Sequence, residues 1–423
     1  MRQFIVFFLF MLLKVPVFCN SQPVDIDISG GAKIVVNLLL PPFQNVNSLT
    51  VDPRSIIIDD LERSGFFRVA QVKLKTTGIK DTVDSNAWKS RGFDALVRAV
   101  VRVIGLGHLE IDFTIYDVNQ GKYLVSKAFI FLDNQVDKVS HLISDQIYKA
   151  FLGVDGYFSS SFAYILEKNG LYELHTSDLN GKNDKIWVKS SDPLLSPKWS
   201  PDNGKLAFVS LEKKKPVIDV LDMTRGTRFV LANYKGSNSS PTWFPDGKHL
   251  LVVLAKDGFS GIYSIASNGS EPSTVIYSRS IDTEPVYSHD GKYIFFTSDR
   301  GGSPQIYRYT INTKSIERVT FDGGYNVSPV VSPDGHYLAY IGKLDGKGYV
   351  VMLMDLLTNE FWPLTSGPYD ESPSFSPNGQ LVMYAYNMGS AIRIVSLLGK
   401  GHYEMHFPDQ KVITPVWGNQ VDR

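Results

Sequence analysis

The chain has 423 residues, which is enough for two or three domains with substantial cores. Its 43 Lys and Arg residues balance 43 Asp and Glu residues, so the overall charge favours neither nucleic acid nor an acidic membrane surface. We therefore expect no nucleic-acid partner.

Residues 1–21 have the pattern of a secretory signal. An unbroken apolar run from Phe4 to Leu13 follows a short cationic start, and it is shorter than the ~20 residues that span a membrane. We predict cleavage between Cys19 and Gln22. Lipidation of Cys19 is the weaker alternative, because the bulky Phe18 precedes it.

Cys19 is the only cysteine of the chain. Removal of the signal would leave a mature protein without a thiol, which suits an oxidising compartment outside the cytoplasm. The cysteine count thus agrees with export, and it excludes thiol catalysis and cysteine-based zinc sites from the mature protein.

Residues 22–152 carry no repeat and predict a small α+β domain. Asp52 and Pro53 have the residue types of a helix N-cap and first turn, and Gly65 is placed to end that helix. Apolar residues at helical spacing mark a second helix further on. The predicted elements are strands at residues 24–28, 33–40, 67–75, 95–104, 108–117 and 122–132, and helices at 53–65 and 134–151.

The segment from Gln22 to Ala32 differs from the rest of this domain. Its short alternating strand, Val24–Ile28, is followed by Gly30 and Gly31, which uncouple it from the strand beyond. A mobile strand of this kind pairs with its own domain or with the sheet edge of a partner. A permanently docked first strand is the alternative.

The remainder of the chain repeats every 44 residues. Pro197, Pro241, Pro285, Pro329 and Pro373 are spaced by that interval, and each is followed by a turn. Two further strand signals recur in the same register. Several short strands at this period predict a β-propeller, here of six blades over residues 157–420.

The first repeat lacks its inner segment, and a spare copy, Thr414–Gly418, lies at the other end of the chain. We therefore predict that the C-terminal strand completes the first blade and closes the ring. Each repeat proline is expected at the start of an inner strand, and the Pro-Asp-Gly sequence is expected to form the turn after it. Aromatic residues predicted to pack between blades are Trp199, Trp243, Tyr287, Phe375 and Trp417.

The sequence contains no persuasive catalytic motif. It has neither a Gly-x-Ser-x-Gly elbow nor a phosphate-binding glycine loop between a strand and a helix. His402 and His406 share one face of a predicted strand, but no third zinc ligand accompanies them. We therefore predict no catalytic residue, no metal site and no cofactor.

Polar loops lead into four of the predicted inner strands. Blade symmetry places them at one mouth of the central canal, and they span residues 237–240, 282–284, 323–327 and 369–371. Hydroxyl and carboxylate groups on a rigid scaffold favour protein docking. Capping of local turns is the alternative for each of these residues.

An exported α+β domain followed by six blades built on Pro-x-Trp-Ser-Pro-Asp-Gly is the combination of the TolB family of the Tol–Pal system. The chain resembles that family over its whole mature length, most specifically at residues 284–287, 296–302, 304–307 and 414–417. His289 departs from the pattern, because it replaces the repeat proline. The resemblance implies a periplasmic adaptor, not an enzyme, that supports outer-membrane integrity and constriction during cell division.

The resemblance also implies two protein contacts for a monomeric protein. The N-terminal strand would engage the C-terminal domain of TolA, and this contact maps onto Val24, Asp25, Ile26, Asp27 and Ile28. The canal mouth would receive the lipoprotein Pal, which would hold the protein at the periphery of the outer membrane. The Pal contact maps onto Ser237, Ser240, Thr283 and Glu284, and the loop analysis adds Asp370 and Glu371. Other envelope proteins are further candidate partners.

Two other functions compete with the adaptor. A periplasmic lyase or hydrolase acting on glycans in the canal would require converging carboxylates or histidines, whereas the inner-strand positions are mostly apolar or small. A bare scaffold would lack a mobile N-terminal segment. Proteolysis or hydrogen exchange of the first mature residues distinguishes the scaffold from the adaptor.

Overall fold

The computed structural model describes residues 35–46, 49–71, 78–79, 81–256, 258–397, 402–407 and 409–419. The chain divides into residues 1–34 and a compact unit of residues 35–423. The predicted signal and the strand predicted at residues 24–28 lie outside the described residues. Among the described helices, none is long and apolar enough to cross a membrane.

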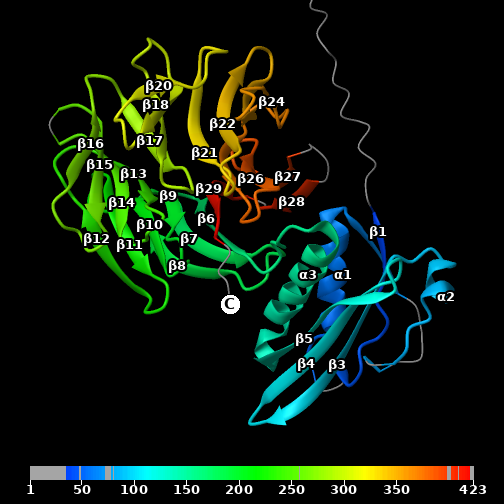
Figure 1. Cartoon of the computed structure of the whole chain (residues 1–423). Coiled ribbons are helices and arrows are strands. Elements are labelled where there is room, and N and C mark those ends of the chain that lie inside the picture. The colour runs from blue at the N-terminus through cyan, green and yellow to red at the C-terminus, as the bar shows by residue number, and fades with distance from the viewer. Residues whose placement is uncertain are drawn as a thin grey trace, which may run out of the picture. The chain divides into compact units, whose positions relative to one another are not determined.

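The N-terminal part is a five-stranded sheet with the strand order β2-β1-β3-β4-β5, accompanied by helices (Figure 1). β1 pairs in parallel with β2 and β3, whereas β3, β4 and β5 are antiparallel. The elements are β1 Val36–Leu39, α1 Pro53–Ser64, β2 Phe67–Ala70, α2 Ser85–Lys89, β3 Ala95–Gly105, β4 His108–Asp117, β5 Lys122–Leu132, η3 Asp133–Gln135 and α3 Val136–Leu152. Among the described residues, the short helix α2 was not predicted, and η3 occupies the start of the helix that was predicted at residues 134–151.

Local chemistry sets the ends of α1 as predicted. The Asp52 carboxylate accepts a hydrogen bond from the backbone N–H of Arg54, and Pro53 opens the helix. Gly65 ends it with a φ of 71°, a left-handed conformation that costs glycine little. Apolar side chains of α1 and α3 are buried together with those of the sheet strands in one core, in which Ile57 and Ile143 are fully enclosed.

The C-terminal part is a propeller of six four-stranded sheets (Figure 1). Its blades, from the inner strand outward, are β29-β6-β7-β8, β9-β10-β11-β12, β13-β14-β15-β16, β17-β18-β19-β20, β21-β22-β23-β24 and β25-β26-β27-β28. The strands are β6 Ser161–Lys168, β7 Leu171–Asp178, β8 Lys185–Ser190, β9 Leu194–Trp199, β10 Lys205–Ser210, β11 Val217–Asp222, β12 Thr227–Ala232, β13 Asn238–Trp243, β14 His249–Leu254, β15 Gly261–Ala266, β16 Ser273–Tyr277, β17 Asp282–Tyr287, β18 Tyr293–Ser298, β19 Gln305–Thr310, β20 Ile316–Arg318, β21 Asn326–Val331, β22 Tyr337–Leu344, β23 Gly348–Asp355, β24 Phe361–Pro363, β25 Glu371–Phe375, β26 Leu381–Tyr386, β27 Ala391–Ser396, β28 His402–His406 and β29 Lys411–Trp417.

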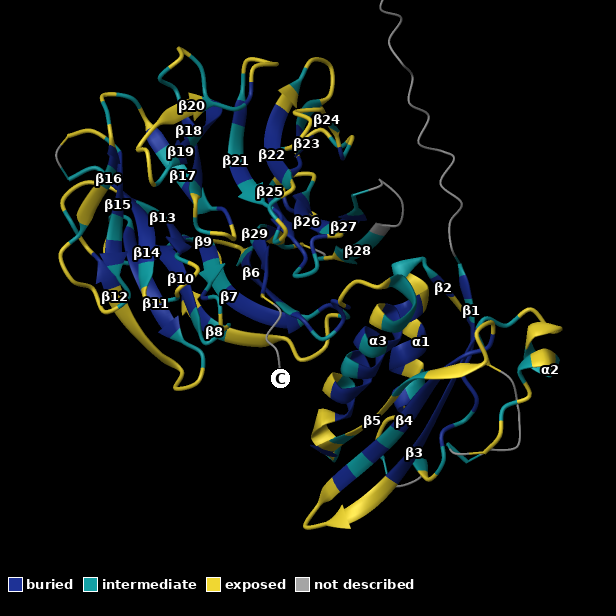
Figure 2. Ribbon diagram, viewed as in Figure 1, coloured by how far each residue is buried: buried dark blue, intermediate teal, exposed yellow. Residues whose placement is uncertain are grey.

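The second and third strands of each blade are mostly buried, and the outermost strands are largely exposed (Figure 2). This follows from packing, because a middle strand is covered by the adjacent blade on each face, whereas the outer strand faces water. The six-bladed propeller behind an α+β region confirms the predicted fold class.

The C-terminal strand closes the ring, as predicted. β29 pairs antiparallel with β6, so residues from the two ends of the propeller share one blade. The indole N–H of Trp417 donates to the Ser160 hydroxyl at 2.7 Å, and its backbone N–H donates to the Ser374 hydroxyl of the preceding blade at 3.0 Å. Trp417 therefore joins both sides of the closure.

The position predicted for the repeat prolines was wrong. Each proline lies in the middle of its inner strand, inside a β-bulge that recurs in all six blades. Proline lacks an N–H, so the ladder must skip a residue at that point. The residue before each proline absorbs the bulge with a positive φ between 45° and 55°: Ser196, Ser240, Glu284, Ser328, Ser372 and Thr414.

The turns that follow the inner strands β9, β13, β17, β21 and β25 contain the predicted residue types at their positive-φ positions. Gly247, Gly291, Gly335 and Gly379 adopt positive φ values in four turns, and Asn203 replaces glycine in the first with a φ of 55°. The five aromatic residues predicted to pack between blades all lie on inner strands. Each of them belongs to a different buried apolar cluster.

Candidate functional site

The canal of the propeller is lined by the residues on either side of the repeat prolines. They enclose a cavity of about 130 Å³ together with the prolines themselves; all six inner strands contribute the residue before the proline, and five of them also contribute the residue after it. Only two of the lining residues are charged, Glu284 and Lys198. The bulge explains this arrangement, because it turns the residue before proline out of the ladder and toward the axis.

Glu284 is held by its own blade and by the next one. Its carboxylate accepts hydrogen bonds from the Thr297 hydroxyl at 2.8 Å, the Ser328 backbone N–H at 2.8 Å and the Ser328 hydroxyl at 2.7 Å. Three donors fix the orientation of this carboxylate at the canal wall. It therefore acts as a rigid contact between β17 and β21.

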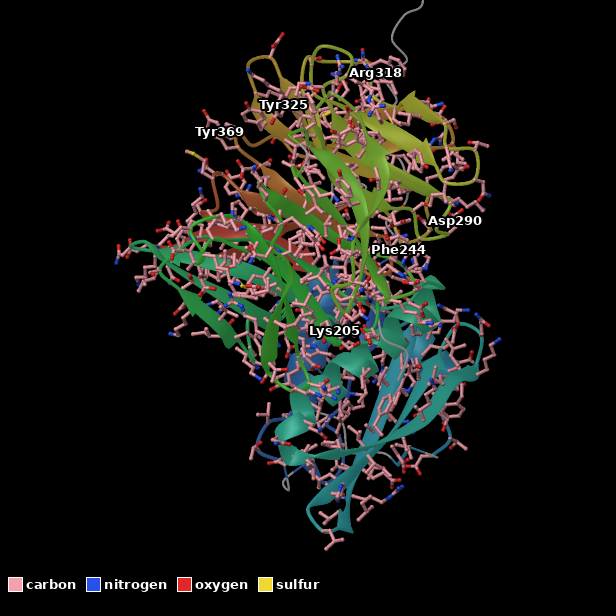
Figure 3. All side chains as sticks on the ribbon, turned by 90° about the vertical axis from the view of Figure 1, so that its left-hand side faces the viewer. Lys205, Phe244, Asp290, Arg318, Tyr325 and Tyr369 are labelled. Atoms are coloured by element: carbon pink, nitrogen blue, oxygen red, sulfur yellow. The ribbon has the colours of Figure 1, made fainter. Side chains whose placement is uncertain are left out.

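One end of the propeller, which we call the loop face, lies where the inner strands begin. It is marked by Ser237, Ile281, Tyr325 and Tyr369, which occupy equivalent positions 44 residues apart. The opposite end, the turn face, carries the Pro-Asp-Gly turns and their neighbours, such as Phe244. Figure 3 shows Tyr325 and Tyr369 on one side of the propeller and Phe244 on the other.

A pocket of about 570 Å³ opens on the loop face beside the canal. Tyr325 and Tyr349 meet edge to face with ring centroids 5.6 Å apart, and Tyr369 lies beside Tyr349 at 6.4 Å. Ile281 is 59% exposed and Tyr369 is 42% exposed, so the rim presents apolar and aromatic surface to solvent. Aromatic side chains above a polar canal have the composition of a protein-binding surface.

Most of the residues predicted for this mouth are brought together. Thr283, Glu284 and Glu371 line the loop-face pocket, and Glu284 also lines the canal with Ser240. The Ser240 and Thr283 hydroxyls lie 3.5 Å apart. Ser237 is exposed on the loop before β13, outside the lining of both cavities.

Asp370 requires a correction, because its side chain is fully buried and is not part of the surface. Burial raises the pKa of Asp370. Asn238, Asp282 and Asn326 hold the equivalent place in three other blades and are also buried. Their polar groups fix the loops that precede the inner strands; for example, Asn238 donates to the carbonyls of Tyr234 and Gly236.

Sequence reasoning missed the apolar part of this site. Ile281 and Tyr349 line the pocket but lie outside the loops predicted for this mouth, whereas Tyr325 lies within the predicted loop 323–327 without having been named as a contact residue. The repeat contained the necessary signal, because Ile281, Tyr325 and Tyr369 are large residues at the position that Ser237 holds in another blade.

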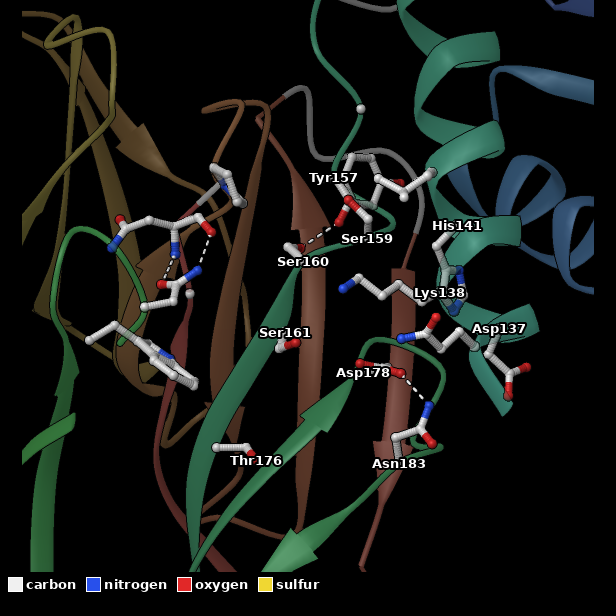
Figure 4. A pocket seen from close by; sticks show the side chains of 18 of the residues that line it. Asp137, Lys138, His141, Tyr157, Ser159, Ser160, Ser161, Thr176, Asp178 and Asn183 are labelled. Carbon is white, nitrogen blue, oxygen red and sulfur yellow. Dashed lines mark hydrogen bonds between the residues drawn. The ribbon is translucent and has the colours of Figure 1, made fainter. Parts of the chain in front are cut away.

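A second pocket, of about 440 Å³, lies between α3 and the propeller strands (Figure 4). Lys138 and His141 come from α3, whereas Asp178 ends β7 and Asn183 lies in the loop between β7 and β8. The Asn183 amide donates to Asp178 at 2.7 Å. Half of the residues that line this pocket carry an amide or a hydroxyl group in the side chain.

Beside this pocket, a buried chain of polar groups links α1, α3 and the propeller. His141 Nδ1 lies 2.7 Å from the Asp60 carboxylate, and His141 Nε2 lies 3.2 Å from the Asn180 amide nitrogen. The amide must donate to Nε2, so Nδ1 carries the proton toward Asp60. Burial lowers the pKa of His141, but the hydrogen bond and charge of Asp60 outweigh it, and the net pKa is raised.

Asp145 of α3 fixes the segment that enters the propeller. Its carboxylate accepts from the backbone N–H groups of Phe158 at 2.7 Å and Ser159 at 3.2 Å. Burial raises the pKa of Asp145 to about 6 in spite of these hydrogen bonds. The aromatic rings of Tyr148, Tyr157 and Trp417 continue the contact between the helix and the closing strand.

No group of three metal-ligating side chains occurs within the described ranges. His406 Nε2 lies 3.0 Å from Glu404, and its side chain is largely exposed. Glu284 is the carboxylate of the canal lining, and Asp299 and Glu371 line the loop-face pocket beside it.

Comparison with known proteins gives a consistent result. Residues 148–421 match the family model described as the TolB beta propeller domain, and residues 24–124 match the TolB amino-terminal domain. The Tol-Pal system protein TolB of Dechloromonas aromatica (strain RCB) is 37% identical over 233 residues, 55% of this chain and 54% of that protein. The protein of the same name from Azoarcus sp. (strain BH72) is 40% identical over 213 residues, 50% of each chain.

The match spans about half the length of these curated relatives. The crystal structure of TolB from Acinetobacter baumannii is similar with a TM-score of 0.84 and 34% identity, over 91% of this chain and 97% of that chain. Two family models that follow one another along the chain and a solved structure that is similar over most of it thus agree, and the chain belongs to the TolB family.

Proposed function

We propose that this protein is a periplasmic adaptor of the Tol–Pal system and that its loop face binds the lipoprotein Pal. The observation that carries the proposal is the loop-face pocket, which Tyr325 and Tyr349 line together with the fixed carboxylate of Glu284, and Tyr369 packs beside Tyr349 at its rim. Exposed aromatic anchors around a polar, preorganised centre suit a protein ligand. The names of the related proteins support the assignment to this system.

The arrangement of the rim supports docking of a folded partner. The pocket has a volume of about 570 Å³ and is bounded by residues of three blades whose strands pack in buried apolar clusters. A rigid surface loses little conformational entropy on binding. Thr283 and Glu371 add polar groups at the edge, where they can form hydrogen bonds with a partner's backbone.

We further propose that residues 22–32 bind the C-terminal domain of TolA, through the alternating segment Val24–Ile28. In this proposal the segment alternates between a docked and a free state. Binding of Pal would change how accessible the segment is to TolA, and binding of TolA would in turn change the affinity for Pal. Together the two contacts would couple events at the inner membrane to the outer membrane during constriction. The N-terminal domain of residues 22–152 and the propeller of residues 157–420 would then each serve one partner.

Calorimetric titration with the periplasmic domain of Pal and the C-terminal domain of TolA tests this proposal. Deletion of residues 22–32 should abolish TolA binding and leave Pal binding intact. Replacement of Tyr325 and Tyr369 by alanine should weaken Pal binding and leave TolA binding intact. Loss of both partners in either variant, with the fold retained by circular dichroism, would contradict separate sites.

A further inference from the structure

The canal is chemically asymmetric. On β17 and β21, Glu284 and Ser328 satisfy each other by hydrogen bonds. On the other side, the adjacent inner strands β25, β29 and β9 contribute Ser372, Thr414 and Ser196 at the equivalent position. These three hydroxyls have no hydrogen-bond partner within the part of the chain that the structure describes, and the Thr414 hydroxyl is buried. A buried hydroxyl without a partner calls for a ligand or water.

Lys198 lies on the same side of the canal, two residues after Ser196 on β9. It lines both the canal and the pocket at the turn face, and no ion pair or hydrogen bond of its ammonium group occurs among the described residues. Removal from water lowers the pKa of Lys198, and the charge of Glu284 offsets this only in part. The ammonium group would therefore gain from a closer anionic partner.

We propose that the Lys198 side of the canal is a binding site for one carboxylate or similar small oxyanion. The Lys198 ammonium would provide the charge, and the hydroxyls of Ser196, Ser372 and Thr414 would donate hydrogen bonds to the anion oxygens. Donors outnumber acceptors on this side, because the only canal carboxylate, Glu284, already accepts three hydrogen bonds. A cation is disfavoured there by the charge of Lys198 itself.

The size of the site limits the ligand. The cavity of about 130 Å³ has room for a single small anion, not for a sugar or a nucleotide. Two sources share this chemistry: a free ion such as acetate or phosphate, or an Asp or Glu side chain of a protein docked at the loop face. The second source rests on the proposed function, and the first does not.

The site can be tested on the full mature protein with lysine labelled in the side chain with ¹³C. Acetate and, separately, inorganic phosphate are titrated while the Cε signal of Lys198 is followed by NMR, with Lys198→Met used to assign it. We expect a saturable shift, weakened about tenfold or more by Thr414→Val combined with Ser372→Ala. Lys248→Met, at an exposed turn, is the matched control and should leave the shift unchanged.

A second arm uses calorimetry with the periplasmic domain of Pal. Pal binding that competes with acetate, or that falls about tenfold in Lys198→Met but not in Lys248→Met, identifies a protein carboxylate as the ligand. A saturable acetate shift without competition identifies a free ion. If Pal does not bind at all, the proposed function fails while the acetate titration still decides the anion site. No saturable shift with either anion, together with Pal binding unaffected by Lys198→Met, would overturn the inference.

Discussion

Ser328 donates two hydrogen bonds to the Glu284 carboxylate, one from its backbone N–H at 2.8 Å and one from its hydroxyl at 2.7 Å. The two residues hold equivalent positions in neighbouring blades, 44 residues apart. The repeat thus places a carboxylate in one blade beside a hydroxyl in the next, and the resulting contact joins the blades at the canal wall.

Replacement of Glu284 by alanine should destabilise the propeller, because the Thr297 and Ser328 hydroxyls lose their acceptor and the Ser328 N–H keeps only its longer bond to Thr297. We expect a loss of about 1–2 kcal/mol in the free energy of unfolding, since the canal admits some water. Urea unfolding measures it. Glu371→Ala is the control, because that residue is exposed on the same face, and it should change stability by less than ~0.5 kcal/mol. Equal losses in both variants would show that the contact has no stabilising role.

Tyr325→Ala and Tyr369→Ala should each weaken binding of the periplasmic domain of Pal by about tenfold or more, as expected for aromatic anchors at an interface. Thermal unfolding should change little, because both rings are partly exposed. Tyr277→Ala provides a matched control, since Tyr277 is 47% exposed on an outer strand and Tyr369 is 42% exposed at the rim. Unchanged affinity in both rim variants would exclude this surface as the Pal site.

Trp417→Ala should destabilise the closed ring by about 3–5 kcal/mol, because it removes a large buried side chain and leaves the Ser160 hydroxyl without its donor. Trp362→Ala on the outer strand β24 is the comparison, and its cost should be smaller because that ring is only partly buried. Chemical denaturation measures both. A smaller cost at Trp417 than at Trp362 would mean that the closing strand is not a major source of stability.

Stability should fall as pH rises through the pKa of Asp145. The folded state raises that pKa from 3.8 to about 6, so the protonated carboxyl favours folding. This contribution is fully present below about pH 3.8 and is lost as the pH passes 6, at a cost of about 3 kcal/mol. Urea unfolding of the wild type and Asp145→Asn at pH 4.5 and 7.5 tests it. The variant should gain stability relative to the wild type at the higher pH, and a difference that does not depend on pH would contradict the prediction.

The sequence by itself determined the repeat, the number of blades and the closure. Prolines at a fixed interval, with glycine or asparagine in the turns, are local signals, because each reflects backbone conformations that few residues tolerate. The displaced copy of the inner segment at Thr414–Gly418 was enough to predict that β29 completes the blade of β6. The capped ends of α1 were readable for the same reason, since Asp52 and Gly65 act on their own neighbours.

Only the tertiary structure decided which polar residues face the canal and which are buried. Asp370 and Glu371 are adjacent in sequence, yet one is enclosed and the other lines the loop-face pocket. Consecutive side chains of an extended segment point to opposite sides, so Asp370 is enclosed while Glu371, the first residue of β25, faces the pocket. The repeat shows which rim residues occupy equivalent positions, but the contact of Tyr349 with Tyr325 and Tyr369 and the lack of a partner for the Thr414 hydroxyl among the described residues are properties of the assembled ring.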